Sequence, residues 1–244
     1  MRWIGIAVVL LLPVIGVAQQ VPAGTVIPIM LNTGLSADKD RTGKAIEGKV
    51  MQDVMTASGV TISKGSRILG HVVSSTNSSG SRSSLTVRFE SVQDRGRNMP
   101  LTAEVLAIAS MQAVAQAQTP INSNPDMMSQ SAWTTRQVGG DVVNRGQGKV
   151  GSADGQTGTW LEGNSVLIKL TPNPDAGCPG GPGYDRAQAV WIFSSTACGT
   201  YDLGKATIAD SGANPPVGNA TITSERNVQI RGGSGWLLMT VAEK

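Results

Sequence analysis

Glycine separates short apolar runs through the first half of this chain, and this spacing constrains the fold more than any other feature. Gly59, Gly65, Gly70, Gly80 and Gly96 follow one another at intervals of roughly ten residues, the turn spacing of sandwiches and barrels. Within Leu85–Phe89, apolar and polar residues alternate, which predicts a half-buried antiparallel strand. The sequence therefore predicts an all-β fold, an antiparallel barrel or sandwich.

Strand patterns return toward the carboxyl end, at Ser165–Leu170, Ala189–Ser194, Thr207–Ala209, Ala220–Thr223, Asn227–Arg231 and Trp236–Val241. Near the amino end, Pro28 interrupts the run Thr25–Leu31, so we expect an edge or bulged strand there, because proline cannot donate to a ladder. The two groups of strands can share one core or form two domains, and the sequence leaves both arrangements open.

A segment rich in Gln, Asn, Ser, Gly and Pro lies between the two groups of strands, at residues 111–158. Gln112–Gln118 can form a short helix, and the rest lacks periodicity, which predicts a flexible linker or long surface excursion. We therefore expect a β domain at 19–110, this irregular insertion, and a β segment at 159–244.

Residues 1–18 have the pattern of a secretory signal peptide. Arg2 supplies the positive charge, Trp3–Val17 is apolar, and Ala18 ends a run of small residues, so cleavage is expected near Gln19. The alternative is an uncleaved anchor, but the apolar run is shorter than the roughly 20 residues that span a bilayer. No later segment is apolar enough to cross a membrane. A periplasmic or extracellular location is therefore expected.

Cys178 and Cys198 are the only cysteines in the chain. An exported protein with one pair of cysteines in one region is expected to oxidise them. A reactive thiol or a metal ligand is the alternative, but no histidine or second Cys-x-x-Cys half lies nearby. The sequence thus predicts a disulfide that ties the proline-rich and glycine-rich loop before Tyr184 to the Ala189–Ser194 strand.

The charge of the chain does not indicate a nucleic-acid partner. The formal net charge is +3, and the local basic residues, Arg82, Arg88, Arg95 and Arg97, alternate with apolar ones along a strand pattern. Aromatic residues that could stack on bases are not interleaved with them. A solvated strand face is the expected role of these arginines.

Three motifs resemble functional sites, but each departs from the pattern that its chemistry needs. The single histidine, His71, has no evident nucleophile or orienting carboxylate, and one histidine cannot form a multi-histidine zinc site. Asp38–Gly43 resembles half a calcium loop, but Lys49 stands where a bidentate glutamate is required. Gly146–Gly151 matches a dinucleotide fingerprint, although no helix pattern follows it. We expect no catalytic residues, cofactor or metal, and no enzymatic activity.

Aromatic rings offer a second functional interpretation. Trp191 and Trp236 lie in apolar strand patterns where burial is expected, and Trp133 has no clear role. Trp160 lies in polar sequence, and Tyr184 and Tyr201 follow it in the carboxyl-terminal half. Exposed rings of this kind could stack on a sugar, so these three residues are candidate ligand-binding residues, with carbohydrate as the candidate ligand.

The opening Val21–Pro28, with Gly24 inside it, and the later turn Ile62–Gly70, which holds Gly65 and Gly70, resemble the β domain of TrbI-like proteins. These proteins belong to type IV secretion and conjugation systems. The resemblance covers residues 21–108 and implies structural turns at the three glycines. A tight turn with positive φ is expected at Gly65, and a bulge or close backbone approach at Gly70. Ser63 stands where the family has proline.

The sequence thus favours an exported, non-enzymatic envelope or secretion-associated protein with a structural or assembly role. Its expected partners are envelope proteins or further copies of itself. The alternative is an extracytoplasmic carbohydrate-binding or ligand-binding β module.

Overall fold

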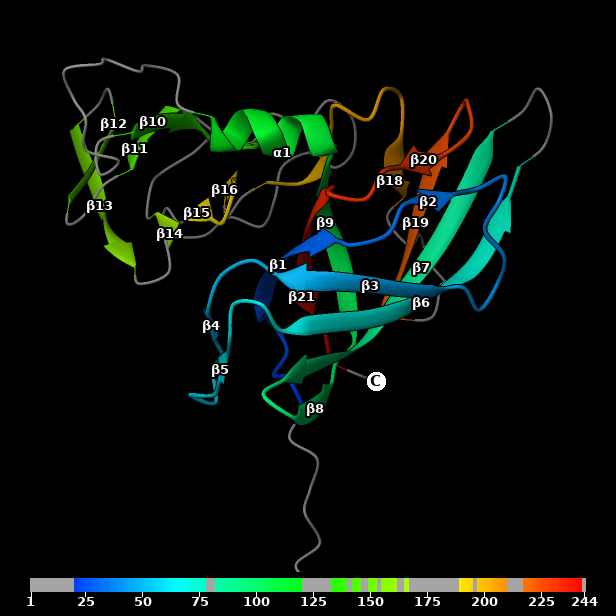
Figure 1. Cartoon of the computed structure of the whole chain (residues 1–244), viewed down its shortest axis with the longest axis horizontal. Coiled ribbons are helices and arrows are strands. Elements are labelled where there is room, and N and C mark those ends of the chain that lie inside the picture. Colours follow the sequence, from blue (N-terminus) through cyan, green and yellow to red (C-terminus); the bar gives the residue numbers. More distant parts are fainter. Residues whose placement is uncertain are drawn as a thin grey trace, which may run out of the picture.

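The computed structural model describes residues 20–77, 82–119, 133–139, 142–145, 149–152, 155–161, 165–166, 189–194, 197–209 and 217–242 (Figure 1). This part of the chain is mostly β, as predicted. It contains one short helix, α1 at Met111–Gln118, where the sequence predicted a helix over Gln112–Gln118. The proposed signal peptide lies outside the described residues.

Ten strands form the main sheet. In chain order they are β1 Val26–Leu31, β3 Ala45–Val50, β6 Arg67–Thr76, β7 Ser83–Asp94, β8 Arg97–Pro100, β9 Ala103–Ala109, β17 Gly199–Tyr201, β18 Thr207–Ala209, β19 Asn219–Ser224 and β21 Gly235–Thr240. Their order across the sheet is β17-β9-β21-β1-β3-β6-β7-β19-β18, and β8 pairs with the end of β7.

The sheet differs from the prediction in two respects. It is mixed, because β17 pairs with β9 in parallel, whereas all its other pairs are antiparallel. A parallel pair needs a long crossover, and α1 together with the following segment supplies it. The hydrogen-bonded order also has two ends, so the described strands do not form a closed barrel.

The two ends of the sheet nevertheless lie close together. β17 and β18 are consecutive in the chain, and the Thr200 hydroxyl donates to the Ala206 carbonyl across the turn between them, at 2.6 Å. Gly218 lies so close to Thr102 that an added Cβ would be 2.4 Å from Thr102 Cγ2. The sheet therefore curls around the hydrophobic core.

The inner core draws on both halves of the chain. It is made of inward-facing residues such as Ile29, Ile68 and Phe89 together with Ile222 and Trp236. The rings of Phe89 and Trp236 meet edge to face with their centroids 5.8 Å apart. Of the two arrangements that the sequence left open, a shared core is the one observed.

A second apolar cluster covers the outer face of β9 and β21. Ala107, Ala109 and Leu237 point outward from these strands and contact Val114 of α1 and Phe193. β15 Ala189–Val190 and β16 Phe193–Ser194 form a hairpin in this cluster. β9 and β21 are therefore buried on both faces.

Smaller sheets complete the structure. β2 Leu35–Ser36 pairs with β20 Gln229–Ile230, and β4 Val54–Met55 pairs with β5 Thr61–Ile62. β10 Trp133–Arg136 pairs with β11 Val142–Arg145, and β12 Lys149–Ser152, β13 Gly155–Leu161 and β14 Ser165–Val166 continue into β15 and β16. The predicted irregular insertion therefore contains strands. Figure 1 shows them on the side of the molecule where α1 lies.

Pro28 lies in an interior strand whose pairing shows no register shift, contrary to the prediction of an edge or bulged strand. β1 pairs with β21 along Val26–Met30 and with β3 only from Ile29 onward. The Pro28 carbonyl accepts from the Met51 N–H at 3.0 Å, so the Pro28 nitrogen also faces the β3 side, just where that ladder ends. An absent N–H is tolerated at this position.

Of the three glycines that the resemblance marks as structural turns, Gly24 and Gly65 precede strands, whereas Gly70 lies inside β6. Gly24 and Gly65 have φ of +80° and +92°, in the region that disfavours other residues. At Gly70 the register of β6 against β7 shifts, and an added Cβ would lie 2.1 Å from the Arg88 carbonyl oxygen. This confirms the predicted close approach.

Candidate functional site

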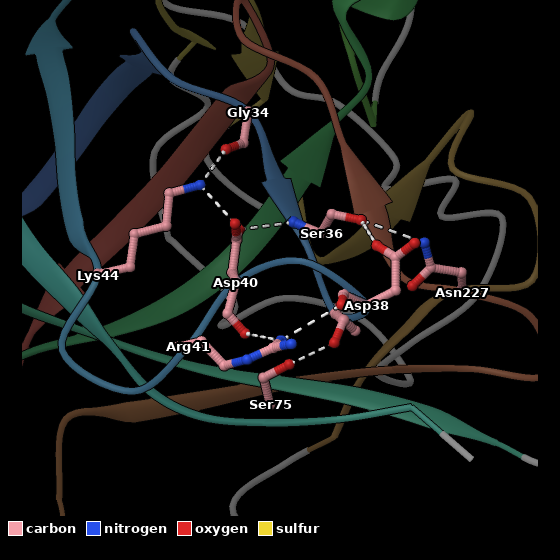
Figure 2. Close-up of polar contacts among 9 residues, drawn as sticks. Gly34, Ser36, Asp38, Asp40, Arg41, Lys44, Ser75 and Asn227 are labelled. Atoms are coloured by element: carbon pink, nitrogen blue, oxygen red, sulfur yellow. Dashed lines mark hydrogen bonds and ion pairs between the residues drawn. The ribbon is translucent and has the colours of Figure 1, made fainter. Parts of the chain in front are cut away.

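A dense polar cluster holds the loop that follows β2. The Asp40 carboxylate accepts from the Ser36 N–H at 2.7 Å and from Lys44 Nζ at 2.6 Å, and Lys44 also donates to the Gly34 carbonyl. The Ser36 hydroxyl donates to Asp38 and accepts from Asn227 Nδ2. Figure 2 shows these side chains converging on one loop.

The cluster fastens the Asp38–Gly43 loop, which resembles half a calcium loop in sequence, to a strand edge. β3 pairs with β6 only as far as His71, and the Ser75 hydroxyl farther along β6 donates to the Ala37 carbonyl at 2.5 Å (Figure 2). The hydrogen bond from Ser36 lowers the pKa of Asp38. The ion pair between Lys44 and Asp40 fixes the conformation of this loop. The loop then lies along the part of β6 that β3 does not pair with.

Asp94 forms a second polar cluster, which the sequence did not indicate. It closes a β7–β8 hairpin whose turn residues Arg95 and Gly96 both have positive φ. One carboxylate oxygen accepts from the Ser66 hydroxyl at 2.7 Å and the Ser63 N–H at 3.2 Å, and the other accepts from Arg97.

Asp94 is only 1% exposed. Burial alone would raise the pKa of its carboxyl, but the hydrogen bonds from Ser66, Arg97 and Ser63 outweigh this effect and lower the pKa to about 2. The carboxylate thus joins the Ser63–Ser66 turn to the hairpin as a charged, fully bonded group.

A pocket of about 370 Å³ opens where three segments meet. We call it the α1 pocket, and its lining residues are Ser110, Met111, Gln112, Asp202, Leu203, Gln229 and Arg231. The Ser110 hydroxyl caps α1 by accepting from the Ala113 N–H at 3.0 Å, and it donates to Asp202 at 2.6 Å. Sequence reasoning missed this pocket. The only local signal was Ser110, two residues before the helix predicted at Gln112–Gln118.

His71 lies on the outer face of β6, where its Nδ1 is 3.2 Å from the Glu90 carboxylate on β7. Arg88 stands opposite it in register, and Arg97 pairs with Asp94. Arg88 and Arg97 thus lie on strands and Arg95 lies in the hairpin turn, whereas Arg82 precedes β7.

Of the three candidate ligand-binding rings, only the Tyr201 side chain lies within the described part of the structure. Tyr201 is 6% exposed and belongs to the second apolar cluster, and its hydroxyl accepts from the Cys198 N–H at 3.2 Å. It is therefore not an exposed stacking ring, because β17 turns it inward. Tyr184 and the Trp160 side chain lie outside the described residues. Trp191 and Trp236 are buried, as predicted.

No group of three or more His, Cys, Asp or Glu side chains in the described structure is placed to hold a metal ion. Within the same residues, no helix is long and apolar enough to cross a membrane. The chain matches no family model, no curated protein and no solved structure.

Proposed function

We propose that this protein is an exported, non-enzymatic structural or assembly component of the cell envelope. The proposal rests on one observation: the two polar clusters of the described structure hold the fold together. The Asp40 and Asp94 clusters both fasten loops and turns to the sheet, and their hydrogen bonds are made within the protein. Such an arrangement suits a rigid body that presents surfaces to partners.

The proposed TrbI-like resemblance is compatible with this role. Its opening segment leads into β1, and its two later glycines lie at the entry to β6 and inside it. We extend the proposal to partners of the same kind, namely envelope proteins or further copies of the chain.

Lateral packing is the mode of contact that we favour over strand addition. The loop after β2 lies along the open edge of β6. On β8, Pro100 lacks an N–H, and its carbonyl already accepts from the Val21 N–H at 3.0 Å. These exposed parts of β6 and β8 are therefore poor templates for an added strand.

Site-specific cross-linking in the native envelope tests the proposal. Met55 is 79% exposed on the β4–β5 hairpin, so a photo-cross-linking residue there can report a neighbour, and the exposed position Lys205 serves as a second site. We expect a discrete cross-linked product from at least one site, in protein whose mass shows a start near Gln19. A monomer that forms no product at either site, or that retains Met1 in a membrane fraction, would contradict the proposal.

We also propose the disulfide between Cys178 and Cys198. Cys198 is buried just before β17, and the described residues contain no free thiol, whereas Cys178 lies outside them. Replacing Cys198 with alanine should lower the free energy of unfolding by about 3 kcal/mol, the value for a loop of this span. Thiol labelling of the denatured, unreduced protein should modify neither cysteine, and labelling of both would rule the bond out.

A further inference from the structure

We propose that the α1 pocket binds a neutral saccharide. This inference goes beyond the structural role proposed above and does not depend on Trp160 or Tyr184. The pocket volume of about 370 Å³ falls at the small end of the roughly 300–1,000 Å³ found for ligand sites. This volume therefore suits a ligand of one or two sugar rings.

The walls of the pocket are fixed by backbone contacts to the rest of the protein. The Ser110 N–H donates to the Tyr201 carbonyl at 3.0 Å, which joins the start of α1 to the end of β17. In the segment that contributes Arg231, the Gly233 N–H donates to the Leu31 carbonyl at 2.8 Å and holds the turn that follows Arg231. Because these segments are already ordered, little conformational entropy is lost when a ligand enters.

Three polar side chains at the pocket retain unused hydrogen-bonding capacity. Gln112, Gln229 and Arg231 make no side-chain hydrogen bond or ion pair with any other part of the described chain. Each glutamine amide both donates and accepts, and the guanidinium offers donors in a planar fork. Neighbouring sugar hydroxyls also donate and accept, so this set can bond to several of them at once.

The charge and apolar character of the pocket favour a neutral ligand over an ion. Asp202 contributes one carboxylate and Arg231 one guanidinium, and these two groups do not form an ion pair with each other. Their formal charges sum to zero, so the pocket does not select strongly for an anion or a cation. Met111 and Leu203 add apolar surface against which the C–H face of a sugar ring can pack.

Titration of ¹⁵N-labelled protein with two probes, chitobiose and maltose, tests the proposal by nuclear magnetic resonance. We expect at least one sugar to shift the backbone amides at 110–112, 202–203 and 229–231 at millimolar concentration. Arg231→Ala and Gln229→Ala should each weaken binding, by roughly tenfold for the charged donor. Lys205→Ala is the matched control. Lys205 is an exposed cation that pairs with Glu225 outside the pocket, so binding should be unchanged.

Three results would overturn the proposal. The first is the absence of shifts at these amides with both sugars. The second is shifts that persist unchanged in the Gln229→Ala, Arg231→Ala double variant. The third is a stronger response to acetate or phosphate than to either sugar, which would identify the pocket as an anion site. Both substituted side chains are exposed, and the remaining amide signals report whether each variant is folded.

Discussion

Replacing Gly70 with alanine should lower the free energy of unfolding by more than about 3 kcal/mol, at the upper end of what overpacking causes. A Cβ at this position would lie 2.1 Å from the Arg88 carbonyl oxygen, 3.0 Å from the Arg88 carbonyl carbon and 3.1 Å from Phe89 Cα. All three atoms belong to the backbone of β7. No side chain can rotate away to relieve the contact, so the two longest strands of the sheet would have to separate.

Gly65→Ala is the matched control, because it tests a conformational penalty without a collision. Gly65 has φ of +92°, but its nearest neighbour to an added Cβ is the flexible end of Lys49, at 3.7 Å. We expect a loss of only about 1–2 kcal/mol from the backbone strain. Urea denaturation of the three proteins measures both values. Equal stability of Gly70→Ala and the unsubstituted protein would show that β6 and β7 do not approach as described.

Local sequence patterns predicted several elements well because their causes are local. The Thr207–Ala209 strand has the predicted bounds, and Gly65 has the positive φ that its turn requires. Alternation and turn chemistry are properties of a few neighbouring residues. These local patterns therefore predict structure without any knowledge of the tertiary contacts.

Pairing between distant segments could not be predicted in the same way. The sequence places β9 and β17 almost a hundred residues apart on either side of the insertion, and nothing in either strand indicates a parallel pair. Ala189–Ser194 was predicted as one strand, yet Trp191 has φ of +56° in a hairpin turn. Its N–H donates to Gln52 at 2.5 Å, so a contact from a distant loop overrides its strand preference.

The candidate pocket was missed for the same reason. Its lining comes from α1, the turn after β17 and the end of β20, and no single one of these segments has a ligand-binding motif. The polar strands β10 to β13 were missed for a different reason. Thr, Val and Gly are the commonest residues in them, and apolar and polar residues do not alternate regularly, so the pattern that predicts a strand is weak.

Replacing Asp94 with asparagine should lower the free energy of unfolding near neutral pH by about 2 kcal/mol. The pKa of Asp94 is lowered from 3.8 to about 2 in the folded protein, so the charged form contributes stability above pH 3.8. This contribution is lost as the pH falls through the folded value. Asparagine keeps an acceptor for Ser63 and Ser66 but presents an amide donor to Arg97, so it cannot reproduce the ion pair.

The pH dependence separates this effect from a general loss of packing. The unsubstituted protein should lose stability relative to Asp94→Asn between about pH 5 and pH 2, until the two have similar free energies of unfolding. Glu47→Gln is the control, because Glu47 also accepts from an arginine, Arg67, but on the exposed face of β3, where solvent screens the pair. Glu47→Gln should therefore lower the free energy of unfolding much less than Asp94→Asn does. A stability difference between the unsubstituted protein and Asp94→Asn that stays constant across this pH range would show that the Asp94 carboxylate has an ordinary pKa in the folded protein.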